Sequence, residues 1–176
     1  MGEPALWPRL QTRRLTLRGP RLRDAPRMAG LANDYDIARM TTRIPHPFAV
    51  EDAADFIGRM EGRDPAREAV FAIESKDEGL LGVLGLHPTA AGTEIGYWLG
   101  RPFWGLGYAT EAAHAALAWA GGAWGRRFIV SGHFADNPAS GQVLIKAGFL
   151  YTGEVTSRFS MARGEEAATR LMVWLA

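Results

Sequence analysis

The feature that most constrains the fold is a glycine-rich turn between a strand-like segment and an alanine-rich segment. The turn, residues 100–107, reads GRPFWGLG; a strand pattern over residues 94–99 precedes it and a helical pattern over residues 109–120 follows. Such a turn leaves the unpaired N–H groups of the first helical residues facing outward. Gly105 and Gly107 have no side chain to hold an anion away, and the positive end of the helix dipole lies there too. The sequence therefore predicts a turn that binds a pyrophosphate-bearing ligand.

Two well-known phosphate-binding turns do not fit this spacing. A P-loop ends in Gly-Lys-Ser/Thr, and this turn contains no lysine. A dinucleotide-binding turn needs a third glycine where Thr110 stands, within an early strand-helix-strand unit. Judged by the turn alone, a simple glycine-rich connector before a tight helix start explains the residues equally well.

The rest of the chain alternates between strand and helix patterns without a linker or a repeat. Short turns at residues 76–79 and 88–92 favour antiparallel neighbours. We expect residues 1–176 to form a single domain with a mixed α/β or α+β plan. Strands are predicted at residues 14–18, 70–73, 80–86, 94–99, 127–134, 150–155 and 168–175, and helices at 24–40 (one or two), 50–63, 109–120 and 138–147.

Composition excludes several classes of function. The 20 basic and 19 acidic residues leave a net charge of +1, so neither nucleic acid nor a membrane surface is an expected partner. The chain has no cysteine, which rules out disulfides, thiolate metal ligands and a cysteine nucleophile. The four histidines lack the spacing of a metal site, so no metal is expected. Neither a signal peptide nor an apolar run of bilayer length is visible, and a cytoplasmic location is the expectation.

A second motif lies one predicted strand and one predicted helix beyond the turn. It reads NPAS at residues 137–140 and continues as KAGF at residues 146–149. With WGLGYA at residues 104–109, it resembles the Gcn5-related N-acetyltransferase (GNAT) superfamily, whose turn is Gln/Arg-x-x-Gly-x-Gly/Ala and whose later motif is Asn-x-x-Ala/Ser followed by Lys-x-Gly-Phe. Only the first position of the turn, Trp104, departs from that pattern. The segments flanking the turn, EIGYWL and ATEA, are similar to the RimJ/RimL-type branch of ribosomal-protein N-terminal acetyltransferases.

The resemblance implies an α+β fold and an acyl-transfer activity. A mostly antiparallel, twisted sheet of about seven strands would be splayed between its fourth and fifth strands and flanked by about four helices. Acetyl-CoA, the implied cofactor, would lie in the gap between residues 94–99 and 127–134. The implied reaction moves an acetyl group to a primary amine, on a protein N-terminus or a small molecule, by direct attack in a ternary complex. The alternative is a module that binds acyl-CoA without turnover, as a sensor or scaffold.

The resemblance also implies roles for individual residues. Glu94 is the candidate base, acting through a water, and Ser140 is the candidate contact for the sulfur. Many family members carry a tyrosine where Leu144 stands here, so Tyr97 and Tyr151 are further candidates for the proton donor. The cofactor-binding residues implied in this way are Tyr97, Trp98, Leu99, Trp104, Gly105, Leu106, Gly107, Tyr108, Ala109, Thr110, Asn137 and Ser140.

The acceptor side is assigned to residues 33–48, the stretch in which this superfamily varies most. Its alternative is a flexible loop without a binding role, and His87, which ends a strand near that side, has a purely structural role as its alternative. The amine acceptor is the expected partner, and an exposed Trp7 or Trp174 would favour a homodimer. The candidate substrate-binding residues are Tyr35, Arg39, His46, Phe48 and His87.

Overall fold

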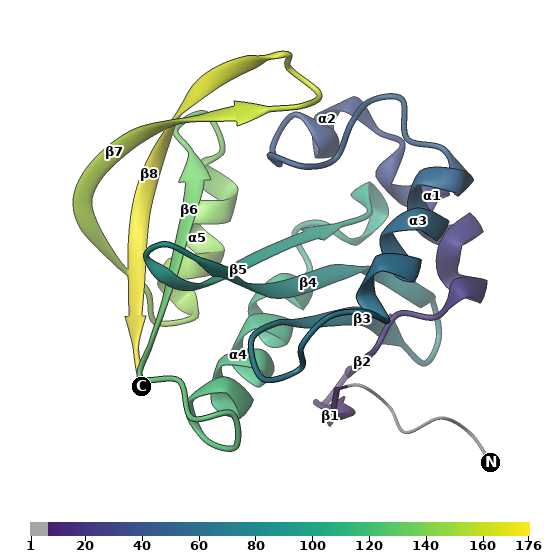
Figure 1. Ribbon diagram of the computed structural model, residues 1–176, viewed down its shortest axis with the longest axis horizontal. Coiled ribbons are helices and arrows are strands. Elements are labelled where there is room, and N and C mark those ends of the chain that lie inside the picture. Colours follow the sequence, from purple (N-terminus) through teal and green to yellow (C-terminus); the bar gives the residue numbers. More distant parts are fainter. Residues whose placement is uncertain (1–6) are drawn as a thin grey trace.

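A single twisted sheet of eight strands carries the fold, which the computed structural model describes over residues 7–176 (Figure 1). The strand order is β1-β2-β3-β4-β5-β6-β8-β7, and only the β5–β6 pair is parallel. The expected α+β class is confirmed, with one strand more than the sequence indicated because two residues near the N-terminus add an edge strand. The strands are β1 (Leu10–Gln11), β2 (Leu15–Arg18), β3 (Ala69–Ser75), β4 (Gly79–Thr89), β5 (Gly92–Leu99), β6 (Phe128–Phe134), β7 (Leu150–Ser160) and β8 (Glu165–Leu175).

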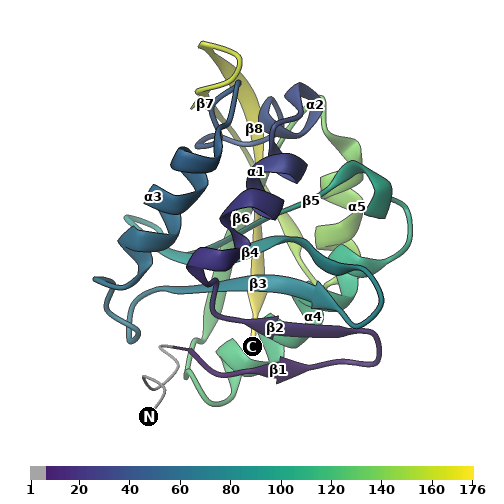
Figure 2. The same ribbon diagram turned by 90° about the vertical axis from the view of Figure 1, so that its right-hand side faces the viewer.

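Helices cover both faces of the sheet (Figure 2). On one face α1 packs against α3 and β4, while on the other α4 packs against β2 and β5, and α5 packs against α4 and β6. The region expected to hold one or two helices holds two, because Asp34 accepts a hydrogen bond from the N–H of Asp36 and starts a new helix. The helices are α1 (Ala25–Ala32), α2 (Tyr35–Ala38), α3 (Val50–Met60), α4 (Tyr108–Gly121) and α5 (Pro138–Lys146), with 3-10 turns at Leu22–Asp24 and Arg101–Phe103.

The core lies on both sides of the central strands. Because helices cover both faces, β3 and β4 are buried along nearly their whole length and read as continuous apolar runs rather than as alternating patterns. Phe71, Leu84 and Leu86 are among the fully buried side chains. On α4 the buried face is made mostly of alanine, which lets that helix lie close to the sheet.

The sheet opens between β5 and β6. Eight positions pair β4 with β5, whereas within the described residues β5 and β6 share one paired position, Glu94 with Val130. At this join the Ser131 hydroxyl also donates a 3.0 Å hydrogen bond to the carbonyl of Ile95. Figure 1 shows β6, β8 and β7 running at a steep angle to β3, β4 and β5. The predicted splay between the fourth and fifth expected strands is confirmed at this join.

The two C-terminal strands are longer than the sequence pattern indicated. Nearly every residue of β7 is exposed, including Leu150 and Val155, so this edge strand lacks the alternation of buried and exposed residues that marks a strand in a sequence. The hairpin end of β7 and β8 reaches back to the segment after α2. There the Ser160 hydroxyl donates to the carbonyl of Thr41 (3.0 Å), and the N–H of Met161 donates to the carbonyl of Thr42 (3.2 Å).

The expectation of an exposed Trp7 is wrong. Its side chain is only 4% exposed, and its indole N–H donates a 2.6 Å hydrogen bond to the carbonyl of Glu68. Trp174 is partly buried against the core. The homodimer therefore loses one of its two supporting residues and stays a prediction. No helix in residues 7–176 is long and apolar enough to cross a membrane.

Candidate active site

A cleft of about 1180 Å³ opens where the sheet is splayed. Both candidate catalytic residues, Glu94 and Ser140, line it, as do all the expected cofactor-binding residues except Leu106. On the acceptor side Arg39, Phe48 and His87 line the cleft. Tyr35 and His46 do not belong to its lining; their rings pack edge to face at 5.6 Å.

The glycine turn adopts a conformation that only glycine takes easily. Gly105 has φ +72° and Gly107 has φ +81°, both in the left-handed region. Gly107 is the N-cap of α4, and it provides no side-chain cap for the first N–H groups of that helix. Those groups are left for a ligand at the positive end of the helix dipole. These uncapped N–H groups fit the diphosphate of a coenzyme, as the sequence of the turn predicted.

Two neighbours fix the shape of this turn. The indole N–H of Trp104 donates a 2.8 Å bond to the carbonyl of Leu99, which holds its ring beside the cleft. Leu106 is 53% exposed and does not belong to the cleft lining. Arg101, which begins the segment, binds Asp34 and Asp36 on the acceptor side at 2.6–2.8 Å and joins the turn to α2.

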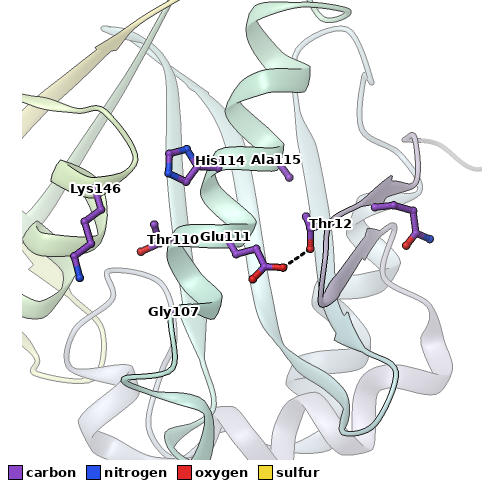
Figure 3. Close-up of a pocket in the computed structure, with 8 residues that line it drawn as sticks. Thr12, Gly107, Thr110, Glu111, His114, Ala115 and Lys146 are labelled. Carbon is purple, nitrogen blue, oxygen red and sulfur yellow. Dashed lines mark hydrogen bonds between the residues drawn. The ribbon is translucent and has the colours of Figure 1, made fainter.

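A second hollow, of about 680 Å³, lies on the outer flank of α4 (Figure 3). Gly107, Thr110 and Lys146 line both hollows, so the two meet at the start of α4. Lys146 brings a positive charge to this point, and sequence reasoning missed its role because it was seen only as part of the KAGF motif. The signal was available: Lys146 is one of two lysines in the chain.

Glu111 anchors the start of α4 to the first two strands. Its carboxylate accepts a 2.6 Å bond from the hydroxyl of Thr12 (Figure 3). It also accepts bonds from the N–H of Arg14 (2.8 Å) and from the Arg14 guanidinium (2.7 Å). Burial alone would raise the pKa of Glu111, but these bonds outweigh it and the pKa lies below its usual value. This ionised carboxylate holds the helix, and so the turn before it, in place.

On the α4–α5 face of β5, a tyrosine meets the candidate sulfur contact. The hydroxyl of Tyr97 lies 3.0 Å from Oγ of Ser140 and donates to the Ser140 carbonyl at 3.1 Å. Burial raises the pKa of Tyr97 to about 12, so the hydroxyl keeps its proton at neutral pH. Leu144, the position at which the resemblance implies a tyrosine in many family members, is fully buried on α5. The Tyr151 hydroxyl bonds instead to Nε2 of His133 at 2.9 Å.

Asn137 begins α5. Its side-chain oxygen accepts a 3.3 Å bond from the N–H of Ser140, as the N-cap of the helix. The cap fixes the orientation of Asn137, which lines the cleft and whose amide nitrogen remains available as a donor to a ligand. The predicted cofactor contact thus sits at a residue that also positions Ser140.

The opposite face of β5 looks toward α1 and α3. There Glu94 pairs across the strands with His87 of β4, so the two side chains share one face. Both oxygens of Glu94 accept bonds from the guanidinium of Arg158, at 2.7 and 3.2 Å. Since Arg158 belongs to β7, this ion pair bridges the two halves of the splayed sheet.

Glu68 is a buried carboxylate that sequence reasoning overlooked. It lies just before β3, its side chain is 8% exposed, and its Oε1 is 2.5 Å from Nδ1 of His87. Its other oxygen lies 3.5 Å from the guanidinium of Arg63. In the sequence Glu68 ends a polar run, GRDPARE, and only its place directly before an apolar strand sets it apart.

Metal chemistry has no evident ligand set in this cleft. Across residues 7–176 no group of three or more His, Cys, Asp or Glu side chains is arranged to hold a metal ion. The chemistry of the lining is instead that of hydrogen-bond donors on one face of β5 and titratable groups on the other.

Comparison with known proteins decides the family. Residues 14–150 match the model described as an acetyltransferase (GNAT) domain. The chain belongs to the GNAT acetyltransferase family. The expected acetyl-CoA-dependent N-acetyltransferase, with acetyl-CoA as cofactor, is confirmed at this level, and so is the likeness to the RimJ/RimL branch.

Individual relatives agree with this GNAT assignment. An uncharacterized N-acetyltransferase, YoaA of Bacillus subtilis, is 28% identical over 153 residues, covering 84% of this chain and 86% of the relative. A ribosomal-protein-serine acetyltransferase of Escherichia coli is 35% identical over 88 residues, covering 48% of each chain. The structure of Mycobacterium smegmatis RimJ in complex with a CoA-disulfide superposes with a TM-score of 0.79 at 25% identity, covering 92% of this chain and 82% of RimJ.

Proposed function

We propose that this GNAT protein acetylates a primary amine, on a protein N-terminus or a small molecule, by direct attack of the amine on acetyl-CoA in a ternary complex. The observation that carries the proposal is the Gly105–Gly107 turn. It leaves the first N–H groups of α4 uncapped by a side chain, beside a cleft at the one join where the sheet is splayed.

The lining fits acetyl-CoA along its length. Backbone N–H groups from Gly105 to Ala109 would hold the diphosphate, with Lys146 adding a positive charge beside them. Asn137 would donate to the pantetheine arm. When bound, acetyl-CoA supplies an acetyl group activated as a thioester. A backbone N–H of β5 near Tyr97–Leu99, at the open join, would orient that carbonyl and stabilise the charge that develops on its oxygen.

Tyr97 and Ser140 would supply the proton that the departing sulfur needs. Their hydroxyls lie 3.0 Å apart, and the raised pKa of Tyr97, about 12, keeps its proton available. A hydroxyl reaching in from β5 would do the work of the tyrosine that the resemblance implies at the Leu144 position. Ser140 is then the contact for the sulfur, and Tyr97 the reservoir of the proton.

The acceptor would enter over the α1–α3 face of β5. A free α-amino group has a pKa near 8 and a lysine amine one near 10.4, so either arrives largely protonated at neutral pH and must lose a proton before it attacks. Glu94 and His87 lie side by side on that face, and each stands as a candidate for taking it. The similarity to a ribosomal-protein-serine acetyltransferase supports a protein as one class of acceptor.

Calorimetry with acetyl-CoA tests the proposal first. Acetyl-CoA should bind and raise the melting temperature, while free acetate at the same concentration should do neither. Release of CoA thiol, measured against a panel of peptides and small amines, then identifies the acceptor. Absence of binding at millimolar acetyl-CoA would refute the cofactor assignment, and tight binding without turnover of any amine would favour the acyl-CoA sensor.

A further inference from the structure

One pair of titratable side chains in the cleft is not explained by coenzyme binding. His87 and Glu68 lie on the acceptor side, joined by a 2.5 Å hydrogen bond between Nδ1 and Oε1. The imidazole is about one-fifth exposed and the carboxylate less than one-tenth. A carboxylate buried to this degree needs partners, and here they are His87 and, at 3.5 Å, Arg63.

A hydrogen bond from His87 to a carboxylate at Glu68 favours one tautomer of the ring. An ionised carboxylate only accepts hydrogen bonds, so the bond to Glu68 requires a proton on Nδ1. In a neutral imidazole Nε2 then carries the free lone pair. Among the described residues Nε2 has no hydrogen-bond partner. Every fully buried side-chain nitrogen in that part of the chain has a partner, so Nε2 is not fully buried, and His87 lines the cleft.

The backbone makes room for this ring. His87 and Gly85 lie two residues apart on the same face of β4, and a Cβ added at Gly85 would collide with Nε2. Nε2 therefore lies over the strand, beside the face of β5 that carries Glu94. Burial lowers the pKa of His87 below its ordinary value of 6.5 and outweighs the bond to Glu68, so the ring is neutral at pH 7.

Glu94 is less suited to accept a proton, because both its oxygens are already bound by Arg158. The charged groups that face His87 are Glu68 from the loop before β3, Arg43 from the loop after α2, Arg63 from the turn after α3 and Glu94 across the strand pair. Arg43 and Arg63 disfavour a positive charge on the His87 ring, which keeps the ring in its neutral, proton-accepting form.

We propose that Nε2 of His87, held in the accepting tautomer by Glu68, takes the proton from the acceptor ammonium group, while Glu94 and Arg158 tie the two halves of the sheet together. This rests on the proposed function. The ammonium N–H bond breaks, its proton forms the Nε2–H bond of an imidazolium, and the electron pair stays on the nitrogen as the nucleophile. His87 is thus the catalytic base, and Glu68 is a positioning residue.

The first test needs neither acetyl-CoA nor an acceptor. Long-range proton–nitrogen NMR spectra of the free protein, recorded through a pH titration, should show His87 protonated at Nδ1 alone near pH 7, with a titration midpoint below 6.5. Glu68→Gln should weaken the tautomer preference, and Glu68→Asp should restore it in part. An Nε2–H tautomer, or a ring that is charged at pH 7, would overturn the proposal.

The second test compares His87→Gln with Glu94→Gln in acetylation of a peptide α-amine. Without its base the enzyme must wait for the neutral amine, whose fraction rises from about 3% at pH 6.5 to about 76% at pH 8.5 for a pKa of 8. The rate ratio of wild type to His87→Gln should therefore be about 25-fold larger at pH 6.5 than at pH 8.5, and that of Glu94→Gln nearly constant. The reverse pattern would assign the base to Glu94.

Calorimetry separates failure of this proposal from failure of the proposed function. Acetyl-CoA should bind wild type, His87→Gln and Glu94→Gln within about twofold of one another, since neither residue lies on the coenzyme face of β5. If wild type binds acetyl-CoA and turns over but His87→Gln shows no pH-dependent loss, the assignment of His87 fails while the acetyltransferase stands. If wild type does not bind acetyl-CoA, the proposed function itself fails.

Discussion

Gly105→Ala is the sharpest test of the phosphate-binding turn, because the added methyl group meets no neighbour. No atom lies within 4 Å of a Cβ built at Gly105, so packing does not change. Only the backbone conformation, φ +72°, opposes the substitution. Holding alanine in the left-handed region costs about 1–2 kcal/mol, and the loss of freedom in the unfolded chain offsets about 0.4–1 kcal/mol of it.

The structure allows this cost to appear in two measurable places. If the free protein keeps the turn, unfolding becomes easier by about 0.5–1 kcal/mol, or a few degrees in Tm for a chain of this size. If the free turn relaxes instead, the backbone must return to the left-handed region when the ligand binds, and acetyl-CoA affinity falls about 5- to 30-fold. We expect one or both losses, measured by thermal unfolding and calorimetry.

Gly30→Ala is the matched control, since it makes the same chemical change on the exposed side of α1. There too no atom lies within 4 Å of the added Cβ, and the backbone is helical. This variant should gain about 0.5–1 kcal/mol in stability and bind acetyl-CoA as wild type does. Gly105→Ala that melts and binds like wild type would refute the role given to the turn.

Three further variants test other parts of the structure. Tyr97→Phe should lower kcat about 10- to 100-fold with little change in acetyl-CoA affinity, because it removes the proton beside Ser140; an unchanged kcat would dismiss Tyr97 as donor. Asp24→Asn breaks a buried pair with Arg18 and should cost about 2–3 kcal/mol in urea unfolding at pH 7. Burial alone would raise the pKa of Asp24, but bonding to Arg18 outweighs it and lowers the pKa. The difference in unfolding free energy between wild type and Asp24→Asn should therefore shrink as pH falls below about 4, and a constant difference would contradict the pairing. Lys146→Met should weaken acetyl-CoA binding several-fold and make the affinity less dependent on salt. If the variant and wild type bind acetyl-CoA equally at every salt concentration, a contact between Lys146 and a phosphate is excluded.

The sequence reveals the glycine turn because that turn is made by backbone. A turn that needs two left-handed residues must show two glycines, and a helix that starts there must follow at once. The alternation in β2, the apolar runs of β3 and β4 and the short turns between strands likewise mark β2 to β6 in the sequence. The backbone conformation of the turn is set by its own residues, so a local pattern reveals it, although the distant bonds of Glu111 then hold the turn in place.

The acceptor side is less predictable because distant side chains build it. Glu68 and His87 are 19 positions apart, and Glu94 and Arg158 are 64 apart, so neither pair leaves a spacing signal. Trp7 looks like a surface residue in the sequence, yet it is buried and bonds to the backbone of Glu68. Such partnerships follow from how the sheet brings its strands together, which local patterns do not encode.

Strand β5 explains how one site joins these two kinds of chemistry. Successive side chains of a strand point to opposite faces, so Tyr97 faces α5 and the coenzyme side while Glu94 faces His87 and the acceptor side. The two faces communicate only where β5 and β6 part, because elsewhere the paired sheet separates them. A slip of one residue in the pairing of β5 with β4 would exchange every side chain between the faces and put the proton donor among the acceptor groups. The register of this one strand, held by eight pairs with β4 and by the Glu94–Arg158 bridge, therefore decides which side chains line each side of the cleft.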